Sequence, residues 1–150
     1  MSILSYHQED FGINFADFEH ELGIISTRKG LSSTIEVCPE LLKNRFFTGD
    51  IADAWVAAYA EQLAFIFRLN YPDWIWSPDR FLNEPYFQDA QSTRAKLFHI
   101  LKSPPAFTRR NLFVDCVLPS IQLKRGRPTS SLPHKRMMNR KRVARYRSRQ

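Results

Sequence analysis

The stretch that decides the fold of this chain reads Tyr71-Pro72-Asp73-Trp74-Ile75-Trp76-Ser77-Pro78-Asp79-Arg80-Phe81-Leu82-Asn83-Glu84-Pro85-Tyr86-Phe87. Six aromatic side chains and three prolines fall within these 17 residues. A large aromatic side chain buries ~150–250 Å² when it packs, which is more apolar surface than a solvated loop normally carries. The segment is therefore expected to form the floor of a core or of a groove that receives a partner.

A second dense segment lies downstream, and it reads Ser103-Pro104-Pro105-Ala106-Phe107-Thr108-Arg109-Arg110-Asn111-Leu112-Phe113. In both segments a serine precedes a proline, as at a helix N-cap followed by proline in the first helical turn. The pattern predicts short helices over 78–82 and from the Pro104-Pro105 pair through Phe107.

Apolar residues at helical spacing mark the longer elements. The longest predicted helix covers 51–69, with Asp50 as its N-cap and Asp53 in its first turn against the positive helix end. Tyr71-Pro72 ends it, because proline removes a hydrogen-bond donor and restrains the residue before it.

Shorter helices are predicted over 14–22, with Asn14 as cap and Gly23 as stop, over 39–46 and over 92–102. The segment 27–34 is predicted to be an exposed connection. Hairpin signals and strict alternation are scarce. The sequence therefore predicts a mainly α protein: a single compact helical domain over 1–123 with short, proline-punctuated helices, followed by a basic tail over 124–150.

Charge separates these two parts. Residues 124–150 carry eleven of the 22 Lys and Arg residues and none of the 15 acidic residues, so the tail is +11 and the body −4. Such asymmetry is typical of a tail that binds nucleic acid or an acidic partner. The composition of the tail also predicts that it is disordered when free.

The tail begins with a short motif, Lys124-Arg125-Gly126-Arg127-Pro128. This motif resembles an AT-hook, a minor-groove DNA-binding element with an Arg-Gly-Arg-Pro core. Narrow A·T-rich minor grooves attract inserted arginines, glycine lets the backbone lie near the groove floor, and proline keeps it extended. The resemblance implies contact with A·T-rich DNA, although Thr129-Ser130-Ser131 follows the core in place of further basic residues.

The remaining cations of the tail form a second block, at Lys135, Arg136, Arg140, Lys141, Arg142, Arg145, Arg147 and Arg149. They are expected to bind nucleic acid through counterion release, which is salt-sensitive and unselective. Two alternatives stay open: a polycation that binds any polyanion, and a tail that binds an acidic protein cleft.

The residues that carry catalytic chemistry form no enzymatic pattern. His7, His20, His99 and His134 share no metal-ligand spacing, and neither a P-loop nor a GxGxxG or GxSxG motif occurs. The sequence thus predicts no enzyme, no cofactor and no metal site.

Cys38 and Cys116 lie far apart without a CxxC spacing, which favours a reducing compartment. The N-terminus lacks a signal-peptide core, and no apolar run approaches the ~18 residues of a membrane span. A cytoplasmic, soluble protein without membrane association is expected.

The body carries a second resemblance, over roughly 48–121. The matching motifs are Thr48-Gly49-Asp50, Asp53-Ala54-Trp55, Glu61-Gln62-Leu63-Ala64, Pro72-Asp73-Trp74, the run from Phe81 to Phe87 and the run from Ser103 to Phe113. In this order they resemble a small bacterial helical module, some examples of which look like antitoxins, including antitoxins encoded beside nucleotidyltransferase-like toxins. The resemblance implies a partner-binding protein and names no catalytic residue.

Together these features predict an antitoxin-like protein whose body binds a cognate toxin and whose tail contacts operator DNA for autorepression. Trp and Tyr dominate interface hot spots, so the expected partner-binding residues are Trp74, Trp76, Tyr86 and Phe87, flanked by Arg109 and Arg110. One alternative is a DNA-binding regulator whose body only forms a homodimer. A further alternative is an RNA- or ribosome-associated protein.

Overall fold

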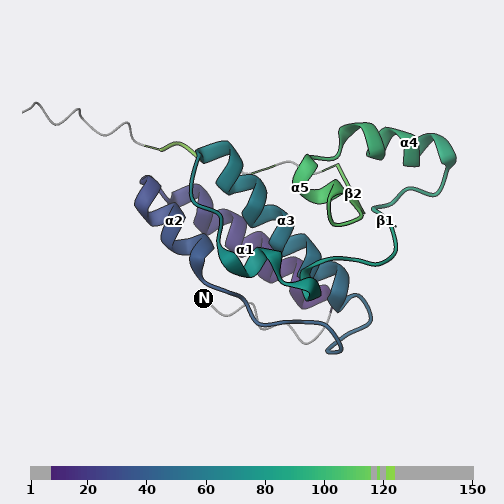
Figure 1. Ribbon diagram of the computed structural model, residues 1–150, viewed down its shortest axis with the longest axis horizontal. Helices are drawn as coiled ribbons and strands as arrows, with labels where there is room; N and C mark the ends of the chain where they lie inside the picture. Colours follow the sequence, from purple (N-terminus) through teal and green to yellow (C-terminus); the bar gives the residue numbers. More distant parts are fainter. Residues whose placement is uncertain (1–7, 116–117, 119–120, 124–150) are drawn as a thin grey trace, which may run out of the picture.

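The structure, a computed structural model, describes residues 8–115, 118 and 121–123 (Figure 1). Its elements follow in the order α1 (Gln8–Ile24), α2 (Arg28–Glu36), α3 (Gly49–Phe67), η1 (Asp73–Trp76), η2 (Pro78–Arg80), β1 (Tyr86–Phe87), α4 (Thr93–Lys102), α5 (Pro105–Thr108) and β2 (Leu112–Phe113), where η denotes 3-10 helix. The predicted mainly α class is confirmed.

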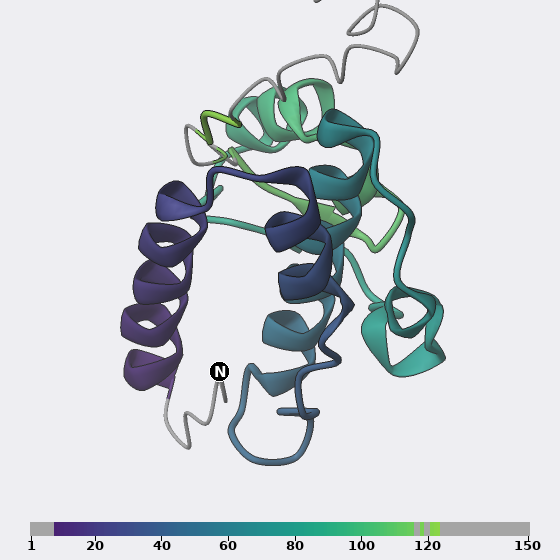
Figure 2. The same cartoon turned by 90° about the vertical axis from the view of Figure 1, so that its left-hand side faces the viewer.

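Helix α3 is the central element, in contact with α2, η1, η2, α5 and β2. Figure 2 shows α1 to the left of α3 and α2 in front of it, with the α4–α5 part of the chain near one end of α3 (labels in Figure 1). A helix that is apolar on most of its sides is buried by the elements around it. Here the small buried residues Ala52, Ala54, Ala57, Ala58, Ala60 and Ala64 let the surrounding elements approach the helix axis closely.

The ends of α3 differ slightly from those expected. The helix begins at Gly49 after Thr48, and Asp50 lies inside the first turn with its carboxylate accepting a hydrogen bond from the Ile51 amide at 2.9 Å. It ends at Phe67, because Arg68 adopts the left-handed conformation (φ 52°) and its amide closes the last turn. Tyr71-Pro72 lies beyond this end, so it follows the helix without terminating it.

The prediction of an exposed connection over 27–34 is wrong, because the segment forms α2. Thr27 caps this helix, and its hydroxyl accepts a hydrogen bond from the Gly30 amide at 3.1 Å. Leu31 and Ile35, one turn apart, are both buried. The cap and the two buried side chains outweigh the low helix propensity of the glycine and serines in the segment.

The helix predicted over 39–46 is also wrong, since this segment contains turns and a bend but no helix. The Asp53 carboxylate accepts hydrogen bonds from the Leu42 amide at 2.9 and 3.0 Å and from the Lys43 amide at 2.8 Å. Asn44 takes a left-handed conformation with φ 68°. The Asp53 carboxylate of α3 thus replaces the internal hydrogen bonds of a helix.

Helix α1 is longer than predicted, running from Gln8 rather than from Asn14.

A two-stranded parallel pair, which the sequence did not predict, closes the second half of the domain. β1 pairs with β2 in the register Tyr86 to Leu112 and Phe87 to Phe113. In the sequence, α4 and α5 lie between the two strands. The Ser92 hydroxyl caps α4 by accepting a hydrogen bond from the Ala95 amide. Both helices arise close to the residues where they were predicted.

Candidate partner-binding surface

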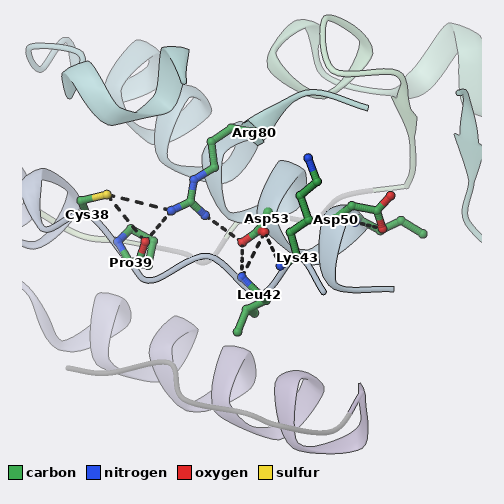
Figure 3. A network of polar contacts seen from close by, with 8 residues as sticks. Cys38, Pro39, Leu42, Lys43, Asp50, Asp53 and Arg80 are labelled. Atoms are coloured by element: carbon green, nitrogen blue, oxygen red, sulfur yellow. Dashed lines mark hydrogen bonds and ion pairs between the residues drawn. The ribbon is translucent and has the colours of Figure 1, made fainter. Parts of the chain in front are cut away.

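A buried ion pair attaches the aromatic segment to the first half of α3 (Figure 3). Arg80 Nη1 lies 3.0 Å from Asp53 Oδ1, and both side chains are almost fully buried. Arg80 also donates a hydrogen bond to the Pro39 carbonyl. Burial raises the pKa of Asp53, while the Leu42 and Lys43 amides and the charge of Arg80 act in the opposite direction. Asp53 was predicted to lie in the first helical turn against the positive helix end, but its carboxylate instead joins three chain segments.

A second carboxylate, two turns further along α3, binds two consecutive arginines. Glu61 Oε1 lies 2.6 Å from Arg109 Nη1, and Glu61 Oε2 contacts Arg110 Nη1. Arg110 is fully buried and also donates to the Ala106 and Ile75 carbonyls, each at 2.9 Å. Burial lowers the pKa of Arg110, and Glu61 opposes that shift. Arg110 is therefore a core residue and not, as predicted, a residue that flanks an exposed groove.

Trp76 lies above this arginine pair. Its ring centroid is 5.6 Å from the guanidinium carbon of Arg109, 5.7 Å from that of Arg110 and 6.1 Å from the Tyr71 ring. Trp76 is 43% exposed and Tyr71 45% exposed, and the Arg109 side chain is half exposed. We call Tyr71, Trp76 and Arg109 the Trp76 cluster, an exposed aromatic–cationic surface whose arginine is held by Glu61.

The other predicted partner-binding residues lie elsewhere and are half-buried. Trp74 donates from Nε1 to the Ile35 carbonyl at 3.0 Å, and the Arg80 guanidinium carbon lies 5.2 Å from its ring centroid. This contact joins η1 to α2. Tyr86 and Phe87 belong to β1, where Phe87 stacks on Phe113 with ring centroids 4.7 Å apart. The structure thus brings together only Trp76, Arg109 and Arg110 of the six residues.

Sequence reasoning missed a second exposed apolar surface, on α4. Its members are Leu97, Phe98, Ile100 and Leu101, exposed by 56%, 48%, 45% and 83%. The available signal was the number of large apolar residues in this ten-residue helix, which is more than one core-facing stripe requires.

No group of three or more His, Cys, Asp or Glu side chains within the described residues could hold a metal ion. A mostly apolar open pocket of about 320 Å³ lies between α1, α2, α3 and η1, lined in part by Phe18, Ile35, Leu63 and Trp74. No helix in the described ranges is long and apolar enough to cross a membrane.

The nucleic-acid-binding residues predicted between Lys124 and Arg149 lie outside the described residues, as does Cys116. Cys38 is exposed and not part of a disulfide in the described chain. No protein-family model matches this chain, and neither does a curated protein or a solved structure.

Proposed function

We propose that this protein is antitoxin-like: its helical body binds and neutralises a cognate toxin, and its basic tail contacts operator DNA. The observation that carries the first half is the Trp76 cluster. An exposed Trp held against an exposed Arg and a Tyr combines the three residue types that are most enriched in interface hot spots.

The support beneath the cluster strengthens this proposal. Glu61 lies on the central helix and contacts Arg109 at 2.6 Å, while the fully buried Arg110 lies under the Trp76 ring. Side chains that are already positioned lose less conformational freedom on binding. The cluster is therefore suited to binding a preformed protein surface.

The charge distribution supports the second half. Residues 1–123 have a net charge of −4, so the body as a whole repels a phosphate backbone, whereas residues 124–150 carry +11. A toxin-binding body and a DNA-binding tail divide the two tasks of an autorepressing antitoxin. The AT-hook-like motif at 124–128 is the part of the tail best suited to an A·T-rich minor groove.

The test of toxin binding is co-expression of the full chain with the protein encoded beside it, followed by calorimetric titration of the purified pair. Trp76→Ala should weaken the complex at least about tenfold, as expected for a hot-spot residue, with an unchanged circular dichroism spectrum. Phe47→Ala is the matched control, since Phe47 is 99% exposed and lies outside the cluster. Full affinity in Trp76→Ala would contradict the proposed interface.

The DNA half is tested separately with the double variant Arg125→Ala/Arg127→Ala. Its affinity for an A·T-rich duplex should fall, while its affinity for the toxin should not change. Equal affinity of the unaltered protein for A·T-rich and G·C-rich duplexes would contradict the A·T preference and indicate that the tail binds any polyanion.

One observation favours a second candidate, an RNA-associated protein. Exposed aromatic rings beside cations stack on unpaired bases, and Trp76 next to Arg109 offers this arrangement. In that case Trp76→Ala would weaken binding of a single-stranded RNA, measured by fluorescence anisotropy, and would leave any protein partner unaffected.

A further inference from the structure

Helix α4 is attached to the domain by one side only. Ala95 and His99, one turn apart, are its half-buried residues, and His99 Nδ1 lies 3.1 Å from the Phe113 carbonyl oxygen. None of its side chains is fully buried within the described structure. Figure 1 shows α4 at the outer edge of the molecule, beyond α5 and the strand pair.

The opposite side of α4 is apolar. Leu97 and Leu101 are one turn apart, and Phe98 and Ile100 lie beside them on the helix surface. All four side chains are exposed, Leu101 by 83%. Four exposed apolar side chains on one ten-residue helix form a contiguous stripe, and such patches mark interaction sites more often than isolated exposed residues do.

Positive charge borders this stripe. Arg94, Phe98 and Lys102 follow one another at intervals of one turn, so the two exposed cations lie at the ends of the row that contains Phe98. The sequence from residue 90 to residue 114 holds five Lys or Arg and no Asp or Glu. The surface therefore complements a ligand that is apolar in the middle and acidic at its flanks.

We propose that α4 is a second docking element, which receives an amphipathic helix with acidic flanks from the partner protein. Leu97 and Leu101 contact the apolar face of that helix, while Arg94 and Lys102 pair with its carboxylates. The proposal rests on the proposed toxin-binding function and identifies a second contact with the same partner.

A second copy of this chain is a poorer occupant. Two α4 helices paired antiparallel about a two-fold axis would bring Arg94 of one copy next to Lys102 of the other, and like charges at such distances repel. The arrangement has no acidic residue on either helix to offset this repulsion, because α4 contains none.

An anionic membrane is also a poorer occupant. Residues 1–123 outside 90–114 carry six Lys or Arg against all 15 acidic residues of the chain. Anionic headgroups would attract the cations beside α4, but they would repel the net acidic remainder of the body. A partner helix contacts α4 locally and avoids this cost.

The experiment uses the full chain and two synthetic helical peptides, each with a leucine stripe, one flanked by glutamates and one by lysines. Fluorescence anisotropy should show at least tenfold tighter binding of the glutamate peptide. Leu101→Ser should remove at least tenfold of that affinity, and Arg94→Glu/Lys102→Glu should reduce the preference for the glutamate peptide. Phe47→Ser, at another exposed apolar residue, should change neither.

The dependence on Leu101 separates α4 from the basic tail, which also attracts glutamate peptides. Binding that is equal in the unaltered protein and in Leu101→Ser would overturn the proposal. It would also be overturned by dimers that Leu101→Ser dissociates in sedimentation, or by flotation with phosphatidylserine vesicles that Leu101→Ser abolishes. These measurements contain no toxin, so their failure is distinct from a failure of Trp76→Ala to weaken the toxin complex.

Discussion

Arg110, which is fully buried, contacts the Glu61 carboxylate of α3 across a separation of 49 residues in the sequence. Because Arg109 occupies the other oxygen of the same carboxylate, one acidic side chain determines the position of both a core arginine and a surface arginine. The exposed Trp76 cluster is thereby connected directly to the central helix.

Replacement of Arg110 by methionine should destabilise the protein by about 3–5 kcal/mol, because it leaves buried Glu61 with only a half-exposed partner. Arg109→Met should cost only ~0–1 kcal/mol, as for other solvent-screened pairs. Urea unfolding measures both. The double replacement Glu61→Leu/Arg110→Met should recover part of the loss, and equal effects of the two single variants would contradict the buried pair.

Gly49→Ala should destabilise the start of α3, because a Cβ at this position would lie 2.1 Å from the Leu42 carbonyl oxygen. The contact is with backbone, so relief requires movement of the segment that Asp53 holds. Gly23→Ala is the control: nothing lies within 4 Å of its Cβ position, and alanine is favoured there by about 1 kcal/mol in helix propensity. In thermal unfolding, the midpoint temperature should fall for Gly49→Ala and rise for Gly23→Ala.

Loss of the Thr27 hydroxyl should weaken α2. Thr27→Ala removes the acceptor for the Gly30 amide, and the loss of such a cap costs about 1 kcal/mol. Ser33→Ala, at an exposed position inside the same helix, should be neutral or slightly stabilising. Hydrogen exchange of the α2 amides should become faster in Thr27→Ala alone; unchanged protection would show that the buried Leu31 and Ile35 suffice.

Burial raises the pKa of Asp53 above 3.8, so the folded protein holds this proton more tightly than the unfolded chain does. Between pH 3.8 and the raised pKa, the contribution of Asp53 to the free energy of unfolding should fall as pH increases. Urea unfolding at closely spaced pH values upward from 3.8 measures the slope. Asp53→Asn should remove this dependence of the free energy of unfolding on pH. The control variant Asp73→Asn, at an exposed residue, should retain it. A contribution that rises with pH would show that Arg80 and the two amides outweigh burial.

The sequence predicted the helical class, α3 and α4, because apolar spacing and caps are local signals. The prediction failed at 27–34, where glycine and serines of low helix propensity occur in a helix that two buried side chains stabilise. It also failed at 39–46, where the hydrogen bonds come from Asp53, at least ten residues away. Local patterns contain no information on such distant partners.

The candidate site was predicted in part for the same reason. Composition singled out Trp76 and Arg109, since aromatic and cationic residues are recognisable individually. That Arg110 is buried while its neighbour is exposed depends on Glu61. The available hint was two acidic residues, Asp53 and Glu61, within an alanine-rich helix, where a lone charge needs a partner.

Helix α4 contributes no fully buried side chain to the described domain, and this has an evolutionary consequence. Substitutions on its outer side can accumulate with little effect on folding, so selection for a new partner and selection for stability act on separate residues. Related chains should therefore keep Glu61 and Arg110 while the residues of their α4 stripes diverge. Each chain could then acquire specificity for its own partner protein without losing stability first.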